Sequence, residues 1–338
     1  MQISKIYSNR KNKTAVYSDL IYEWEDDISH QIKIPIYSFG RTKETLLRYF
    51  FRSLNILKIE KLFQRIESFR KPKSFTLVFE LYPRSYFSFQ VSSNKIPYII
   101  DFDYRVDLDS FYKTYKNCKL VFISSLEAFN YLRRNQCPLN IVHLPLSISD
   151  RYSLNTTAIG NKEFDLIVVR ANKVFMEYLD SFAKEFPDFE YVIRKWEGSQ
   201  IYKNNVYYSN KRGVLGEYSD RTAYINLLKK TKVALYATPG CDENTKRFMN
   251  HVTPSLFEFV SSGCRIIARY PHNEETKYFN LSTISPSVNT YEEFRELLVS
   301  YLNTTSSEYL NNSEKFIQAV YTSNKVKKLN SILCTINN

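Results

Sequence analysis

The chain alternates short apolar runs with amphipathic stretches, and this alternation stops once and then starts again. Four apolar runs of strand length precede the interruption, at 75–81, 96–102, 119–123 and 141–145. Residues 125–135 have helical spacing, with Leu126, Phe129 and Leu132 on one face. Apolar strands that alternate with helices are typical of parallel sheets covered on both faces. The sequence therefore predicts an α/β fold.

A polar segment at 147–162 interrupts the pattern and contains no clear strand or helix. Beyond it, strands are expected at 164–169, 190–193, 233–237 and 265–268, and helices at 174–186, 224–230, 254–261, 291–302 and 313–333. A chain of 338 residues is long enough for two domains. We place them at 1–148 and 163–308, with a linker at 149–162 and C-terminal helices at 309–338. Ligands of such domains bind beyond the carboxyl ends of the strands, so we expect the site between the domains.

The charge balance limits the kinds of partner. Lys and Arg number 47 against 35 Asp and Glu, which gives a net charge of +12. This excess favours a polyanion, an anionic lipid surface or a phosphorylated substrate. The chain has only 7 glycines, so an anion site has to rely on helix termini and basic side chains rather than on a glycine-rich loop.

Five irregularly spaced cysteines indicate neither a disulfide framework nor a zinc site. The first residues lack an apolar signal core, and no run of 18 apolar residues occurs. We therefore expect a protein of the reducing cytoplasm, with no segment that spans a membrane.

The block at 224–269 contains the clearest candidate anion site. Thr253 is a good helix N-cap, Pro254 suits the first helical position, and Gly263 suits the end of the helix. The preceding loop supplies Lys246 and Arg247. A helix N-terminus flanked by two cations predicts an anion site.

Glu258 lies about one turn into this helix. A carboxylate at that place can accept two hydrogen bonds from a vicinal diol such as a ribose. The alternative interpretation is a solvent-facing glutamate on an ordinary helix.

Residues 256–268 resemble part of a known family. Their sequence, LFEFVSSGCRIIA, is similar to the second half of the E-x7-E motif in the donor domain of GT-B glycosyltransferases, especially the retaining, family-4-like bacterial polysaccharide enzymes. Glu258 matches the second glutamate. Asn250 stands where the first glutamate is usual, and the run from Asn250 to Pro254 resembles a subset of polysaccharide glycosyltransferases. The resemblance implies two Rossmann-like domains that face each other across a cleft, with the first domain binding the acceptor and the second the donor.

A second match concerns the diphosphate. In the family, the first donor-domain strand ends in an arginine that is soon followed by a lysine, and both contact the nucleotide diphosphate. Residues 164–170 with Lys173 have this form. Charge-assisted contacts from Arg170 and Lys173 would stabilise a leaving diphosphate without a metal. The expected donor site thus comprises Arg170, Lys173, Lys246, Arg247, Asn250, Thr253, Ser255 and Glu258, with no metal ligand and no cofactor besides the nucleotide-sugar substrate.

Two carboxylates follow an expected strand of the first domain. Asp101 and Asp103 point to the same side of an extended chain. One of them is our candidate catalytic residue, orienting an acceptor hydroxyl, while Arg105 would hold phosphate or the other aspartate. The alternative is an ordinary turn or cap role for the aspartates. Glu80 is a weaker candidate.

These features predict a hexosyltransferase that moves a sugar from a nucleotide-diphosphate sugar to a growing surface glycan of the O-antigen (lipopolysaccharide) or capsule type. The resemblance implies a retaining, metal-independent reaction on a lipid-linked or oligosaccharide acceptor. The first alternative is a catalytically inactive glycan- or nucleotide-binding homologue, because Asn250 replaces the first glutamate. The second is a nucleic-acid-binding protein, which the +12 charge and the 27 Tyr and 24 Phe would suit, although no recognisable nucleic-acid motif accompanies them.

Residues 41–73 form a basic segment with interleaved aromatic residues. Ten cations, among them Arg48, Arg52 and Lys61, stand against three glutamates, and leucines recur at roughly helical spacing. A basic helix with an apolar face can lie in the headgroup layer of a membrane. We therefore expect a cytoplasmic protein that docks on the anionic inner face of the membrane. The alternative is an ordinary helical pair with its apolar residues in the core.

Overall fold

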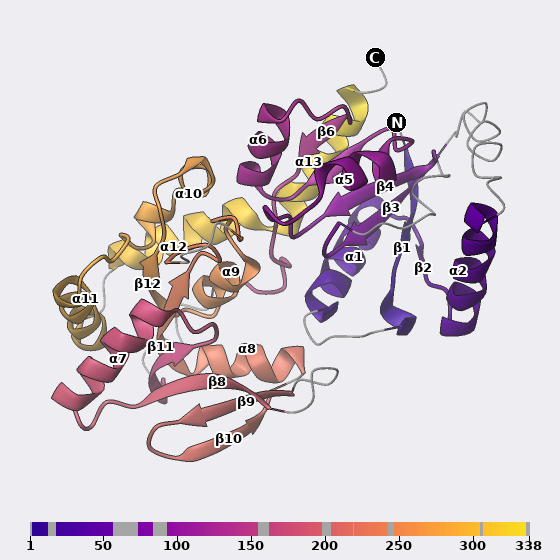
Figure 1. Cartoon of the computed structure of the whole chain (residues 1–338). Helices are drawn as coiled ribbons and strands as arrows, with labels where there is room; N and C mark the ends of the chain where they lie inside the picture. The colour runs from indigo at the N-terminus through magenta and orange to yellow at the C-terminus, as the bar shows by residue number, and fades with distance from the viewer. Residues whose placement is uncertain are drawn as a thin grey trace. The chain divides into compact units, whose positions relative to one another are not determined.

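The structure is a computed structural model that describes residues 2–12, 18–56, 74–83, 93–154, 162–197, 204–218, 220–242, 247–304 and 307–335 (Figure 1). The chain divides into two units. Unit 1 comprises Met1–Leu146 and Thr322–Asn338, and unit 2 comprises Ser147–Tyr321. Each unit is built on its own sheet with helices packed against it.

The described strands of unit 1 form a parallel sheet in the order β2-β1-β3-β4-β5-β6. Their bounds are β1 (Ile3–Tyr7), β2 (Ile36–Tyr37), β3 (Phe75–Glu80), β4 (Lys95–Ile99), β5 (Val121–Ile123) and β6 (Ile141–His143). Every residue of β3 is buried, as expected for a central strand that is covered on both faces. The four strands predicted for this region are confirmed.

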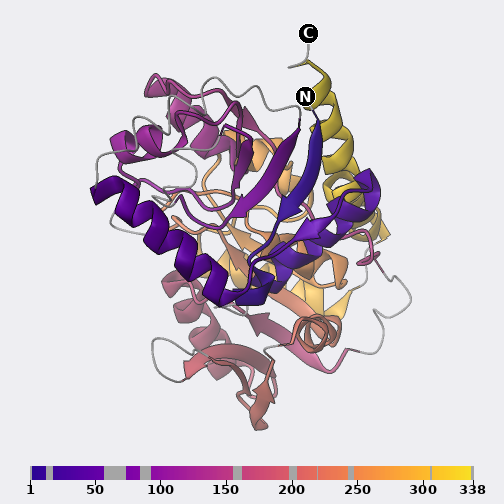
Figure 2. The same ribbon diagram turned by 90° about the vertical axis from the view of Figure 1, so that its right-hand side faces the viewer.

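The helices of unit 1 surround this sheet. Those described are α1 (Ser18–Ile32), α2 (Arg41–Ile56), α5 (Leu108–Tyr115), α6 (Leu126–Arg134) and α13 (Thr322–Thr335), with a 3-10 turn η1 (Arg10–Asn12). Helix α6 begins where predicted, because the Ser125 side chain accepts a hydrogen bond from the Ala128 N–H. Helices α1 and α2 lie on opposite sides of β1 and β2 (Figures 1 and 2).

The described strands of unit 2 form a mixed sheet in the order β10-β9-β8-β7-β11-β12. They are β7 (Phe164–Val168), β8 (Tyr191–Glu197), β9 (Asn204–Ser209), β10 (Gly213–Glu217), β11 (Thr231–Ala237) and β12 (Arg265–Arg269). Strands β8, β7, β11 and β12 are parallel, whereas β9 and β10 pair antiparallel with their neighbours. The expected α/β fold with parallel strands is confirmed, and the second sheet has in addition an antiparallel hairpin that the sequence did not predict. The hairpin escaped prediction because β10 has no buried residue and thus no continuous apolar run.

Helices cover both faces of the unit 2 sheet. They are α7 (Lys173–Glu185), α8 (Arg221–Lys229), α9 (Pro254–Ser261), α10 (Glu274–Tyr278), α11 (Tyr291–Asn303) and α12 (Ser307–Val320), with a 3-10 turn η3 (Leu281–Thr283). On one face, Phe182 of α7 and Phe294 of α11 pack with Leu235 of β11 in one buried cluster. Truncating a buried phenylalanine such as Phe182 to alanine typically costs about 3–5 kcal/mol.

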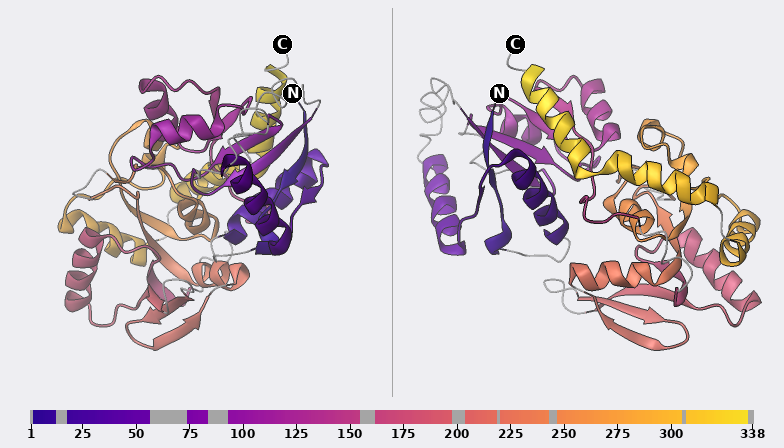
Figure 3. Two further views of the ribbon diagram at one scale, coloured as in Figure 1. Left: turned by 45° about the vertical axis from the view of Figure 1, so that its right-hand side comes forward. Right: turned by 180° about the vertical axis from the view of Figure 1, so that it is seen from behind.

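The C-terminal region differs from the expected single helix at 313–333. The helix is interrupted at Tyr321. This gives two helices, α12, which belongs to unit 2, and α13, which belongs to unit 1. Backbone pairing accounts for the break, because the Ile148 N–H donates to the Val320 carbonyl at 3.0 Å. Each helix then packs within its own unit: Phe316 of α12 contacts Phe257 of α9, and α13 packs against α1 (Figure 3).

Candidate functional site

The carboxyl ends of β7, β11 and β12 lie side by side in unit 2, because these strands are parallel neighbours. The described segments that leave them, at 169–172, 238–242, 247–253 and 270–273, therefore meet at one edge of the sheet. Four residues of the expected donor site lie on the described parts of these segments, namely Arg170, Arg247, Asn250 and Thr253. In open α/β sheets this is the edge where ligands bind.

Helix α9 begins at this edge. Thr253 is its N-cap and Pro254 its first residue, but the Thr253 side chain does not cap the helix. Its hydroxyl instead lies 2.8 Å from the Ser255 hydroxyl, and its backbone N–H donates to the Tyr236 hydroxyl at 3.0 Å. The N-terminus of α9 is thus left without a side-chain cap, as an anion site at a helix N-terminus requires.

Arg170 lies near this helix start. Burial raises the pKa of Tyr236 to about 12, while the hydrogen bond from Thr253 and the charge of Arg170 act in the opposite direction. Arg170 is exposed and directs one guanidinium nitrogen to the Pro239 carbonyl at 3.5 Å. The structure therefore brings together Arg170, Thr253 and Ser255, which the sequence proposed from separate segments.

Lys173 is the first residue of α7, at the same edge. Its side chain is 88% exposed, and its ammonium lies 3.9 Å from a Glu177 carboxylate oxygen. An exposed pair at this distance contributes little to stability, so Lys173 is available to a ligand. Arg247 is exposed as well. Lys246 lies outside the described residues.

Asn250 lies near the end of the loop that follows β11. Its amide oxygen accepts from the Thr238 hydroxyl at 2.8 Å, and its backbone carbonyl accepts from the Asn273 amide at 3.3 Å. The loop packs so closely that a Cβ on Gly240 would lie 2.5 Å from the Phe248 carbonyl oxygen. Asn250 is therefore held in one orientation by neighbouring side chains.

An ion pair that the sequence did not reveal ties this loop to the end of β12. Arg269 contacts both carboxylate oxygens of Asp242, at 2.6 and 2.7 Å, and lowers the pKa of that carboxyl. The Asn172 amide donates to the same carboxylate at 3.0 Å. Asp242 has a positive φ of 63°, which residues other than glycine seldom adopt, so the backbone of the loop is constrained at this residue.

Glu258 is buried, so the solvent-facing alternative is wrong. One of its carboxylate oxygens lies 2.6 Å from Arg221, and the other accepts from the Tyr224 hydroxyl at 3.2 Å. The side chains of Glu258 and Arg221 are 7% and 15% exposed. Each carboxylate oxygen has two lone pairs, so the group keeps capacity for a further donor. Sequence reasoning missed Arg221, whose only local signal is its place one turn before Tyr224.

The two candidate catalytic residues of unit 1 line one cavity of about 430 Å³ at the carboxyl ends of β3 and β4. Asp103 accepts from the Arg105 backbone N–H at 2.9 Å and forms an ion pair with the Arg105 guanidinium. Of the two roles considered for Arg105, the structure shows contact with the aspartate. Asp101 has partners of its own. Glu80 is buried on β3 and does not line this cavity.

No metal centre is evident in the part of the chain that the structure describes, where no three His, Cys, Asp or Glu side chains are grouped to hold an ion. His143 has a structural environment, because burial lowers its pKa to about 4 and its ring nitrogen lies 3.1 Å from the Ser124 carbonyl. Within the same described segments, no helix has the length and apolar character needed to cross a membrane.

No protein-family model matches the sequence, and neither does any curated protein. Solved structures are similar in fold. Sucrose-phosphate synthase from Thermosynechococcus elongatus matches with a TM-score of 0.60 and 9% identity, covering 99% of both chains. A trehalose-6-phosphate synthase matches with a TM-score of 0.58 and 10% identity, covering 98% of this chain and 99% of that one.

A pneumococcal O-GlcNAc transferase in complex with UDP and GlcNAc matches with a TM-score of 0.50 and 14% identity over 89% of this chain. The chain spans only about three fifths of that protein's length, 61%. At such identities these likenesses establish the fold, which is the GT-B fold of glycosyltransferases. The resemblance seen in the sequence is thus confirmed at the level of the fold.

Proposed function

We propose that the chain is a hexosyltransferase that uses a nucleotide-diphosphate sugar, with retention of configuration and without a metal. The observation that carries the proposal is that Arg170, which contacts the Pro239 carbonyl after β11, and the uncapped N-terminus of α9, whose Thr253 N–H donates to Tyr236 of β11, lie at the same carboxyl edge of the unit 2 sheet. The GT-B fold and a structural neighbour solved with UDP support it.

In this proposal, the diphosphate binds at the start of α9 with Arg170, Lys173, Arg247 and Lys246 around it. Backbone N–H groups and guanidinium groups would stabilise the charge that develops on the leaving diphosphate. The bond between the sugar and the diphosphate breaks as the acceptor oxygen attacks from the same face, and the acceptor proton passes to the diphosphate. Glu258 would accept hydrogen bonds from the ribose hydroxyls while the ion pair with Arg221 holds its carboxylate in one orientation.

For the acceptor, we propose the 430 Å³ cavity of unit 1, with Asp101 or Asp103 orienting the attacking hydroxyl. Asp103 is paired with Arg105, and Asp101 has partners as well, so both remain candidates. The finer proposal is an acceptor of the O-antigen or capsule type, carried on a lipid.

The test is a thermal-shift and calorimetric screen with UDP, GDP, dTDP and CMP. One nucleotide should bind clearly best, and the matching nucleotide-sugar should release its diphosphate in the presence of an acceptor glycan, with or without EDTA. Binding without any transfer would favour the catalytically inactive homologue. Absence of binding by every nucleotide would contradict the proposal, and loss of transfer in EDTA would contradict the metal-independent mechanism.

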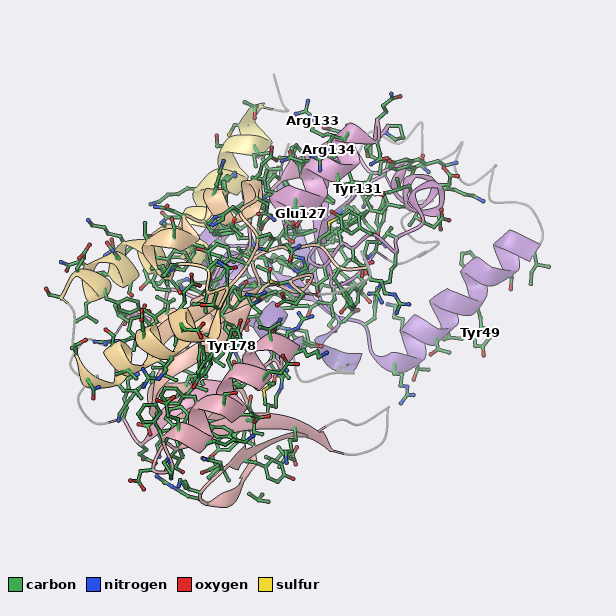
Figure 4. All side chains as sticks on the ribbon, turned by 60° about the vertical axis from the view of Figure 1, so that its left-hand side comes forward. Tyr49, Glu127, Tyr131, Arg133, Arg134 and Tyr178 are labelled. Carbon is green, nitrogen blue, oxygen red and sulfur yellow. The ribbon has the colours of Figure 1, made fainter. Side chains whose placement is uncertain are left out.

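We also propose that the protein docks on anionic membranes through α2. Leu46, Tyr49, Phe50 and Ile56 recur at helical spacing on this helix, and they are 64%, 62%, 49% and 72% exposed. Figure 4 shows α2 with Tyr49 labelled on it. Exposed apolar residues on one helix face, within a segment that carries ten cations, suit an anionic bilayer surface. Of Arg48 and Arg52 only the backbone is described, and Lys61 lies outside the described residues.

Sedimentation with liposomes tests this docking. The protein should sediment with vesicles that contain anionic lipid and not with neutral ones, and salt should release it because surface attraction is screened. Changing Arg48, Arg52 and Lys61 together to Glu, or Leu46 and Phe50 to Ser, should abolish binding. Val214→Ser is the control, because Val214 is equally exposed, 65%, in unit 2. Equal sedimentation with both vesicle types would contradict the proposal.

A further inference from the structure

Helix α13 carries a lysine on the face that packs into unit 1. The buried residues of this helix recur at helical spacing, and besides Thr322 and Lys325 they are the apolar residues Val326, Leu329 and Leu333. Lys325 is only 4% exposed, so it is as deeply buried as its apolar neighbours. It therefore occupies a position where an amphipathic helix normally has an apolar residue.

The Lys325 ammonium lies close to three aromatic rings and to no hydrogen-bond acceptor. The ring centroids of Tyr98 on β4, Trp24 on α1 and Phe79 on β3 are 4.2, 4.9 and 5.8 Å from it. None of the described residues accepts a hydrogen bond from the ammonium. Aromatic faces attract a cation but leave its N–H groups unpaired, so burial of the charged form is costly.

The position of Lys325 along the helix adds to this cost. Lys325 is the fourth residue of α13, which begins at Thr322. The first turn of a helix is the positive end of its dipole, where a cation is disfavoured. Burial also lowers the pKa of Lys325 to about 7 from 10.5. The neutral amine is thus the form that suits the packed helix, and the charged form is better solvated by water.

Charged side chains near the three rings act on other groups. They are Glu23, Glu25 and Asp27 of α1, Glu80 of β3 and Lys95 of β4, together with Lys328 of α13. Burial alone lowers the pKa of Lys325, so none of these charges contributes to it. Glu80 raises the pKa of Lys95, although burial lowers it more. Glu23 and Asp27 have partners of their own.

Two of the neighbouring titrations fall in a lower pH range. Burial raises the pKa of Glu25, which is ion-paired with Arg10, to about 7 from 4.5, so its effect on stability lies below pH 7 and has the opposite sign. His143 of β6, with a pKa lowered to about 4, also acts below pH 7. Lys328 is half-buried and its pKa is lowered by burial, so it acts in the same direction as Lys325 and needs its own variant.

We propose that α13 is a pH-dependent latch on unit 1, held closed by the neutral amine of Lys325 and released when this amine takes up a proton. Release follows because the ammonium regains water when the helix moves away from α1 and from the rings of β3 and β4. The described strands of the unit 1 sheet all precede α13, so the sheet remains intact when the helix is released. The inference is independent of the proposed transferase function.

Hydrogen exchange of the full chain between pH 6 and 9 tests the latch. Opening takes up one proton between pH 7 and 10.5, so the opening equilibrium constant should fall by up to about tenfold for each pH unit in this window. Protection factors of the α13 amides, corrected for the intrinsic exchange rate, should be constant below pH 7 and rise above it. Amides of α6, another helix of unit 1, should not follow this rise. An equal rise in α6 and α13 would show a response of the whole unit and would overturn the latch.

Three variants separate the proton from the packing. Lys325→Met should keep α13 protected at every pH, because it has no amine to protonate. Leu329→Ala should lower the protection of α13 through the cavity that it leaves, yet retain the pH dependence. Lys327→Met, at an exposed lysine of the same helix, should change neither. If the pH dependence survives in Lys325→Met, or is lost in Lys328→Met instead, the proton belongs to another group and the inference is overturned.

Discussion

The carboxyl ends of the two sheets differ in the charged side chains that the structure describes there. In unit 1 the cavity has three aspartates and one arginine, and that arginine is paired with Asp103. In unit 2 the acidic groups, Asp242 and Glu258, are each paired with an arginine, while Arg170 and Lys173 remain exposed. The exposed cations of the unit 2 edge therefore suit a phosphate-bearing ligand, and the described side chains of the unit 1 cavity do not.

The largest expected effect comes from replacing an aspartate of the unit 1 cavity. Asp101→Asn should lower sugar transfer by about 10²–10⁴-fold if Asp101 orients the acceptor hydroxyl, while nucleotide binding stays unchanged. Asp103→Asn is the parallel variant, and Asp109→Asn is the control with the same charge change. Turnover is measured with donor affinity determined on the same preparations. Full activity in both single variants would place the catalytic group elsewhere, with Glu80 next.

A buried lysine in unit 1 and a half-buried lysine in unit 2 extend the comparison to stability. Lys325 of α13, in unit 1, lies over the rings of Tyr98 and Trp24, at 4.2 and 4.9 Å, and its ammonium has no hydrogen-bond acceptor among the described residues. Lys162, in unit 2, donates to the carbonyls of Thr231, Ser262 and Gly263 at 2.8, 3.2 and 2.9 Å. Lys325→Met should therefore stabilise the protein, whereas Lys162→Met should destabilise it by about 1–3 kcal/mol through the carbonyls left unpaired.

The effect of Lys325 on the free energy of unfolding should depend on pH, and its direction follows from the lowered pKa of this lysine. Burial lowers the pKa of Lys325 to about 7 from 10.5, so between these values the unfolded chain binds more protons than the folded one. Stability from this group therefore rises as pH rises from 7 to 10.5. Lys325→Met should raise the free energy of unfolding by roughly 2–4 kcal/mol at pH 7, and the gain should shrink toward pH 10.5. Denaturant unfolding at several pH values measures it, and a destabilised variant at pH 7 would contradict this account.

A smaller effect tests the ribose contact. Glu258→Gln should weaken nucleotide binding by about 1–3 kcal/mol, because the amide replaces a charged acceptor with a neutral group. It also leaves Arg221 without its counter-ion, so the melting temperature should fall too. Tyr224→Phe removes one partner of Glu258 and keeps the ion pair, so it should affect binding less. If Glu258→Gln leaves the nucleotide affinity measured by calorimetry unchanged, Glu258 is not part of the donor site.

The smallest effect concerns the diphosphate. Lys173→Ala should weaken binding of the nucleoside diphosphate by up to about 1 kcal/mol and leave binding of the nucleoside unchanged, because an exposed cation acts only on the phosphate charge. Lys184→Ala is the matched control at the other end of α7. Two results would contradict a contact between Lys173 and the diphosphate. One is that Lys173→Ala weakens binding of the nucleoside diphosphate and of the nucleoside equally. The other is that Lys173→Ala and Lys184→Ala weaken binding of the nucleoside diphosphate equally.

The sequence predicted the strands that are buried on both faces, such as β3, β7 and β11, because these have continuous apolar runs. Strands β1 and β10 escaped prediction, since polar residues interrupt them at the exposed positions. Site residues could be predicted from the sequence where a local rule of helix structure applies, as it does for Pro254 at the start of α9. The pairing of Arg221 with Glu258 depends on the packing of α8 against α9, so it had no usable signal in the sequence.

Hydrogen exchange with and without the best-binding nucleoside diphosphate tests the central claim most directly. The account predicts slower exchange of backbone N–H groups at 169–173 and at the start of α9, with no change at 101–115 in unit 1. A nucleoside without phosphates should protect the start of α9 far less. Protection at 101–115 in place of the α9 start would contradict the assignment of the donor to unit 2.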